Sequence, residues 1–249
     1  SIPHLDTNRL GPEPAQHGLT LDFYRELSIN RRESMFYAPP TTAISLSLGY
    51  ALATVVLSMV LGMPAAWSLA HSARSHFSRL MDPILMLPLG TSAVTLGLGF
   101  IIALDQPPLD LRNSWVLIPF AHTLVAFPFV VRSLTPALRS IRPQLRQAAT
   151  VLGASPGKVF RFIDLPLVGR SLLVAAVFAF TISLGEFGAT ALIARPEYPT
   201  VPVAIYRLIS QPGTMNYGQA LALSTILMII TSAGILSIER LRIADVGEF

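Results

Sequence analysis

Residues 147–166 read "QAATVLGASPGKVFRFIDLP" and separate two long apolar segments of the chain. Pro143, just upstream, suits the first turn of a helix, where the N–H that proline lacks would have no partner in any case. Gly153 lies where a helix commonly ends in a left-handed residue, and Ser155 followed by Pro156 is typical of a helix start. The stretch therefore predicts a helix, a tight turn and a second helix.

The two helices of this predicted hairpin carry a small-sided and basic surface. We expect the first to continue over residues 144–152 and the second to run from 156 to about 164, where a Leu-Pro pair ends it before the next apolar segment. Ala148 and Ala149 give the first helix a surface that another protein can approach closely. Four basic residues surround it: Arg142, Arg146, Lys158 and Arg161.

The composition of the whole chain is that of a membrane protein. Of the 249 residues, 52% are hydrophobic and only 13% are charged, against roughly 25% charged residues in soluble domains. The net charge of +4 does not indicate a nucleic-acid partner, because the basic residues fall in short clusters beside apolar runs. The chain has no cysteine, which excludes disulfides, thiolate metal sites and cysteine nucleophiles.

Five apolar runs are long enough to cross a bilayer core of about 30 Å as helices. The sequence therefore predicts an all-α, polytopic membrane fold with about five transmembrane helices. Gly90, Gly97 and Gly99 in the second run either let a neighbouring helix approach closely or are ordinary membrane-helix glycines. The runs cover residues 42–63, 81–104, 114–131, 167–184 (or 167–194) and 217–238.

The positions of Lys and Arg indicate which loops face the cytoplasm. Cytoplasmic loops are enriched in these residues, so we expect the hairpin and the C-terminus to lie inside and the N-terminus outside. Eleven lie in alternate loops and the tail, namely Arg74, Arg79, Arg132, Arg139, Arg142, Arg146, Lys158, Arg161, Arg170, Arg240 and Arg242, against Arg112, Arg195 and Arg207 in the intervening loops.

Residues 1–40 are accordingly expected to form a periplasmic segment ahead of a membrane domain at 41–249. They contain no signal peptide, so we expect an upstream segment to export them and the chain to be a fragment of a longer protein. Leu21, Tyr24 and Leu27 share a helical spacing, which favours a short amphipathic helix on the outer face, with a plain connector as the alternative.

Motifs of nucleotide binding and catalysis are incomplete or absent. Residues 153–158, GASPGK, resemble a phosphate-binding loop, but one residue is missing between the glycines, Val159 replaces the Ser or Thr, and no strand precedes them. The sequence also has no HExxH, no Gly-x-Ser-x-Gly and no cluster of His residues. We therefore expect neither an enzyme nor a metal site.

Three polar residues within the spans are candidates for a translocation pathway: His122, Ser183 and Glu186. An ionisable residue in a span merits a functional hypothesis, but we favour a neutral His122 bonded to a neighbouring helix. We expect Glu186 to bond helices or backbone nearby rather than to act as a counter-ion, because an unpaired carboxylate in lipid is costly. The scarcity of charged residues in the spans argues against an ATP-independent secondary transporter, the rival class.

The hairpin resembles the cytoplasmic loop of bacterial ABC importer permeases, whose pattern is EAA, three residues, Gly, nine residues and Ile-x-Leu-Pro. The resemblance implies that residues 136–166 form a coupling loop, which docks in a groove on an ATPase subunit dimer. It also implies that ATP and Mg are bound by that partner, and that this chain binds no cofactor and is not an enzyme. The matching positions, with Gln in place of the Glu, are Gln147, Ala148, Ala149, Gly153, Ile163, Leu165 and Pro166.

The resemblance covers nearly the whole chain and, within the family, is greatest to the C-terminal half of fused thiamine and thiamine pyrophosphate permeases. It implies a multi-pass protein of the bacterial inner membrane that carries thiamine or its phosphates, received from a periplasmic binding protein. It further implies an N-terminal permease half on the same fused chain. Permeases for ferric iron and for sulfate share much of the same sequence, so these solutes are the alternatives.

The charge asymmetry generates a topology prediction that the absence of native cysteine makes easy to test. Pro108→Cys and Gly157→Cys are made separately, and intact cells are treated with a membrane-impermeant maleimide. We expect labelling at residue 108 and none at residue 157, because the loop with the basic residues lies inside. Labelling at 157 alone would mean that the orientation is inverted.

Overall fold

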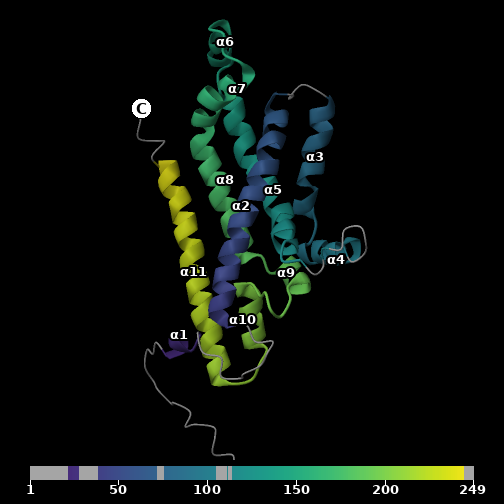
Figure 1. The fold of residues 1–249 in the computed structure, drawn as a ribbon, viewed down its shortest axis with the longest axis vertical. Helices are drawn as coiled ribbons and strands as arrows, with labels where there is room; N and C mark the ends of the chain where they lie inside the picture. The colour runs from purple at the N-terminus through teal and green to yellow at the C-terminus, as the bar shows by residue number, and fades with distance from the viewer. Residues whose placement is uncertain (1–21, 28–38, 72–75, 105–110, 112–113, 244–249) are drawn as a thin grey trace, which may run out of the picture.

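The computed structural model describes residues 22–27, 39–71, 76–104, 111 and 114–243, and every regular element within these ranges is a helix (Figure 1). The all-α prediction is confirmed. Four long helical stretches are apolar enough to cross a membrane, and a bent pair of helices makes a fifth candidate. The four are α2 (Pro40–His71), α5 (Leu117–Ser140), the stretch Pro156–Gly185, and α11 (Thr214–Ile243), of which 214–237 qualifies as the span.

The second predicted run, 81–104, is not one continuous helix. It is divided between α3 (His76–Gly90) and α4 (Ala93–Ala103), whose axes meet at 99°. Gly90 is a poor helix former, and Ser92 adopts an extended backbone that begins α4 as its N-cap. In Figure 1, α4 lies across the long axis of the molecule instead of continuing along it.

Small residues bring α2, α5 and α8 (Leu165–Gly185) together at the centre of the molecule. Ala66, Ala126 and Ala175 are fully buried in the same cluster. A Cβ at Gly62 would lie 2.6 Å from Cγ1 of Val130, so glycine is what lets α2 approach α5 at this point. Close approach through small residues is how helices associate in lipid, where burial of apolar surface gives no driving force.

The predicted hairpin contains α6 (Pro143–Val151) and α7 (Pro156–Val159). The prediction that Leu165 and Pro166 end the second helix is wrong. A π-helical turn, η2 (Phe160–Asp164), joins α7 to α8 without a break, and the Leu165 N–H bonds to the Phe160 carbonyl. The wider turn accommodates a proline inside a helix, because it relieves the clash with the preceding turn.

The opposite end of the molecule is built from α1 (Asp22–Glu26), α10 (Val201–Ile209) and the start of α11 (Figure 1). The short N-terminal helix is therefore confirmed. Leu27 is buried and Tyr24 is exposed, while Leu21 lies outside the described residues. The ring of Phe23 occupies the space that a Cβ at Gly218 would need, which fixes α1 against α11.

Helix α4 packs against α9 (Gly188–Ile193) through glycine on both sides. A Cβ at Gly97 would lie 2.9 Å from both Cα and the carbonyl oxygen of Ala189, and one at Gly188 would lie 2.9 Å from Cβ of Ala93. Gly90 and Gly99 have nothing within 4 Å of such a Cβ. Close helix approach thus holds for Gly97 alone among the three glycines of the second run.

The contact between α4 and α9 predicts different effects for two neighbouring glycine substitutions. Gly97→Ala should lower the free energy of unfolding by about 1–3 kcal/mol, since backbone atoms of Ala189 cannot move aside easily. Gly99→Ala, two residues away on an open face, is the matched control and should not destabilise the protein. Thermal unfolding in detergent, followed by size-exclusion chromatography, measures both. Equal thermal unfolding midpoints for the two variants would contradict the close packing of α4 on α9.

Candidate functional site

The tip of the hairpin is a rigid turn fixed by backbone hydrogen bonds. The Ala154 N–H donates to the Ala149 carbonyl and the Gly153 N–H to the Thr150 carbonyl, each at 2.9 Å. This is the Schellman arrangement, which requires a left-handed residue directly after the helix. Gly153 supplies it, with φ of 84°, so the predicted role of this glycine in ending α6 is confirmed.

The residues that match the permease pattern fall into two groups in space. Gln147, Ala148 and Gly153 are exposed on α6 and its turn. Ile163 and Leu165 are half-buried at the root of the hairpin, where η2 passes into α8, and Pro166 is exposed beside them. The outer group is therefore available for contact with another protein, and the inner group shapes the junction with the membrane span.

Two further residues at the tip were not singled out by the sequence analysis. Val151 and Leu152 are each 87% exposed, at the end of a helix that projects beyond the spans (Figure 1). Two adjacent apolar side chains so exposed at the tip of the hairpin are candidates for contact with another protein. The signal in the sequence is a pair of apolar residues directly before the glycine that ends a small, polar helix.

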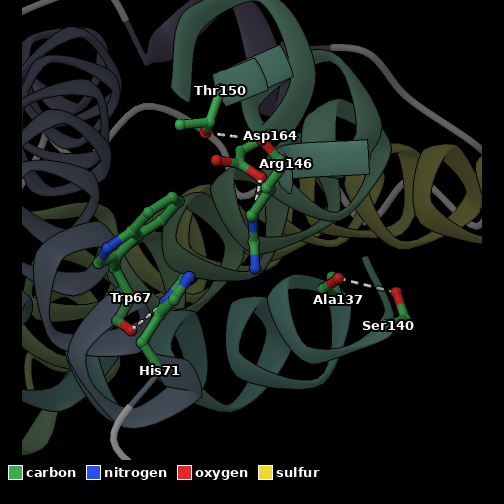
Figure 2. A network of polar contacts seen from close by, with 7 residues as sticks. All are labelled: Trp67, His71, Ala137, Ser140, Arg146, Thr150 and Asp164. Carbon is green, nitrogen blue, oxygen red and sulfur yellow. Dashed lines mark hydrogen bonds and ion pairs between the residues drawn. The ribbon is translucent and has the colours of Figure 1, made fainter. Parts of the chain in front are cut away.

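An ion pair closes the root of the hairpin (Figure 2). Nε of Arg146, on α6, donates to Oδ1 of Asp164, at the end of η2, over 2.7 Å. Asp164 is fully buried, whereas Arg146 retains some exposure. The guanidinium carbon lies 5.4 Å from the ring centroid of Trp67, on α2, within range of a cation–π interaction. The hairpin thus contacts a span to which the chain does not directly connect it.

The pathway candidates His122 and Ser183 belong to a buried polar network. Nδ1 of His122 lies 2.7 Å from Oγ of Ser183, and Nε2 lies 2.7 Å from Oγ1 of Thr190. Ser183 in turn donates to Thr54 at 3.2 Å. The network joins α5, α8, α9 and α2, and the interpretation of His122 as a histidine bonded to neighbouring helices is confirmed. Because all four side chains are buried, their hydrogen bonds hold these helices together.

Glu186 follows the end of α8 and bonds to the backbone. Its Oε1 accepts a hydrogen bond of 2.9 Å from the Ala189 N–H, in the first turn of α9. A carboxylate at a helix N-terminus satisfies an N–H that has no partner within the helix and interacts favourably with the helix dipole. This is the kind of backbone contact that the sequence analysis expected. Any role in a pathway stays a prediction for all three candidates.

The described residues contain no group of three or more His, Asp or Glu side chains placed to hold a metal ion. Two cavities in this part of the chain are not lined by metal-ligating clusters. One of about 210 Å³ lies at the root of the hairpin beside Arg146 and Asp164. Another of about 450 Å³ lies between α2, α4 and α5 and is lined mainly by Leu and Phe, including Phe120 and Phe127.

Comparison with known proteins identifies one family and a consistent set of relatives. The family described as "Binding-protein-dependent transport system inner membrane component" matches residues 58–242. The molybdenum transport system permease protein ModB of Haemophilus influenzae is 34% identical over 205 residues, covering 77% of this chain and 89% of that protein. The putative 2-aminoethylphosphonate transport system permease protein PhnV of Salmonella typhimurium is 28% identical, covering 79% of this chain and 72% of that protein.

A solved structure shares the fold. A chain of the bacterial alginate ABC transporter, in complex with its alginate pentasaccharide-bound periplasmic protein, superposes with a TM-score of 0.67. It is 17% identical, and the match covers 88% of this chain and 81% of that one. At this identity the likeness concerns the fold alone.

The capping contact of Glu186 predicts which substitutions are tolerated. Glu186→Gln should keep the hydrogen bond to Ala189, because the amide oxygen still accepts, and should retain substantial uptake of the transported solute. Glu186→Ala removes the cap and should cost about 1 kcal/mol of the free energy of unfolding. Thermal unfolding and uptake by the reconstituted protein measure these effects. If Glu186→Gln abolished uptake at normal expression, the carboxylate charge itself would be required.

Proposed function

Because the chain belongs to the family of binding-protein-dependent transport system inner membrane components, we propose that it is a permease half of an ATP-driven importer for a small tetrahedral oxyanion. Its membership of the family makes it an inner-membrane permease of an ABC importer for a small solute. The long apolar helices of the described chain agree with this place in the cell. The oxyanion, the ATPase and the second permease half are the parts that we propose.

The chemistry of the relatives' solutes supports an oxyanion. Molybdenum in neutral water is carried as the tetrahedral dianion molybdate, and 2-aminoethylphosphonate ends in a tetrahedral phosphonate. The structure adds that the carboxylate of Glu186 is engaged with the N-terminus of α9, which reduces its repulsion of an anion. The thiamine suggested by the permease resemblance has no support from these relatives, whereas sulfate, one of the alternatives, fits the same chemistry.

The exposed tip of the hairpin is the observation that carries the proposed ATPase contact. Val151 and Leu152 stand at the end of α6 on a turn whose hydrogen bonds leave little freedom. An ATPase subunit dimer that binds ATP and Mg is the partner to which such a tip would dock, with a periplasmic binding protein delivering the solute on the other face. The alginate transporter has a periplasmic protein of that kind.

A second permease half is the remaining partner of this proposal. This second half is either an upstream half fused to the same polypeptide or a second copy of this chain. The mass of the denatured polypeptide, purified from the native membrane without and with cross-linking, distinguishes them. A second copy doubles the mass only after cross-linking, whereas a fused half gives one larger polypeptide without it.

Transport by the complete complex tests the proposed function. Permease, ATPase and binding protein are reconstituted in proteoliposomes with ATP on the hairpin side. We expect uptake that requires ATP and is competed by molybdate, sulfate or 2-aminoethylphosphonate but not by thiamine or ferric iron. If thiamine alone competed, the transported solute would be a cation and not an oxyanion. Uptake driven by an ion gradient without ATP would favour a secondary transporter.

The left-handed turn predicts that Gly153 is needed for coupling and not for insertion. Gly153→Val should cost about 1–2 kcal/mol locally, because a side chain disfavours positive φ, and should misdirect Val151 and Leu152. The variant should reach the membrane in normal amounts, but less ATPase should co-purify with it than with the wild-type permease. Gly157→Val, at an open position with no positive φ, is the matched control. Wild-type association and uptake in Gly153→Val would contradict this account.

A further inference from the structure

The guanidinium of Arg146 connects three elements at the root of the hairpin. It bonds Asp164 through Nε (Figure 2), and its carbon lies over the ring of Trp67, near the C-terminal end of α2. Trp67 stacks on His71 with centroids 4.3 Å apart and meets the ring of Phe160 edge-on at 5.3 Å. Both arms of the hairpin therefore contact the same ring of α2.

The ion pair makes one of the two hydrogen bonds that a bidentate Arg–carboxylate pair forms. Among the described residues, Nη2 of Arg146 and Oδ2 of Asp164 are buried without a hydrogen-bond partner, beside the cavity of about 210 Å³. A buried carboxylate held by one bond contributes little net stability, because the cost of desolvation offsets the attraction. Stability alone is thus a weak reason for a charged pair at this position, and neither residue belongs to the seven-position permease pattern.

The chain itself gives α6 no direct connection to α2. Residue 142 follows α5, and residue 156 leads into α7 and then α8, so the polypeptide joins the hairpin to those two spans only. Trp67 is the ring of α2 that Arg146 faces. The planar guanidinium is suited to such a place, since it pairs with a carboxylate through its edge and with an aromatic ring through its face.

We propose that Arg146 and Trp67 are positioning residues that transmit movement of α6 to α2, with Asp164 holding the guanidinium in place. The inference rests on the proposed function, because the movement is that imposed by an ATPase docked at Val151 and Leu152. Loss of the contact leaves the docking surface intact but separates the docked helix from one of the spans. ATP hydrolysis then continues with less transport.

The ratio of solute transported to ATP hydrolysed tests this proposal in the reconstituted complex. Trp67→Leu and Asp164→Asn should co-purify with the ATPase in wild-type amounts, while the ratio falls about fivefold. The first variant loses the cation–π contact and the second loses the charge that holds the guanidinium over the ring. Trp67→Phe keeps an aromatic face and should stay within about twofold of wild type. Trp115→Leu, at the other tryptophan, which is exposed, is the matched control and should leave the ratio unchanged.

A second measurement needs no variant in the cluster. The permease alone is labelled with 5-fluorotryptophan, assembled with unlabelled partners, and compared by fluorine NMR in its ADP and ATP states, with the Trp115→Phe variant identifying the two signals. We expect the Trp67 signal to shift between the states and the Trp115 signal to stay. An unmoved Trp67 signal, or wild-type transport per ATP in both Trp67→Leu and Asp164→Asn, would overturn the proposal. A wild-type complex without ATP-dependent uptake would instead overturn the proposed function.

Discussion

The hydrocarbon core of a bilayer offers no hydrogen bond to the backbone, so each peptide group within it must find a partner in the protein. This constraint accounts for the long helices, and it bears most strongly on the places where a helix stops. Two such stops occur within apolar sequence, between α3 and α4 and between α8 and α9. The structure brings α4 and α9 together through Gly97 and Gly188. Glu186 caps the second of the two helices, so a backbone N–H at the start of α9 finds its partner in a carboxylate.

The polar groups of the spans obey the same rule. His122 has two ring nitrogens, and each meets a hydroxyl from a different helix. A hydroxyl both donates and accepts, so Ser183 can accept from Nδ1–H of the ring while it donates to Thr54, and Thr190 can donate to the unprotonated Nε2. These bonds fix the relative positions of four helices at one level of the molecule, where apolar side chains alone give little preference for one arrangement over another.

Sequence reasoning succeeded where the determinants are local. Pro143, Gly153 and Pro156 predicted the hairpin, because each restricts the backbone at its own position. It failed at Pro166, because a π-helical turn that admits the proline depends on the whole junction between η2 and α8. The bend after Gly90 was missed for a similar reason: hydropathy counts apolar residues and is unaffected by the direction of the helix axis. The contact of Arg146 with Trp67 joins residues far apart in the chain and left no periodic pattern to find.

The π-helical turn makes the second arm of the hairpin and the span α8 a single rod of 30 residues, about 45 Å long. Ser183, near the C-terminal end of this rod, bonds to His122 and Thr54. Asp164, in the first third of the rod, pairs with Arg146 at the root of the hairpin. A stiff rod that pivots at a point along its length tilts as a whole, so a displacement of one end has a counterpart of opposite sign at the other. A shift of a few ångströms at the hairpin thus moves the end of the rod that carries the buried Ser183 hydroxyl, without any change of secondary structure between them.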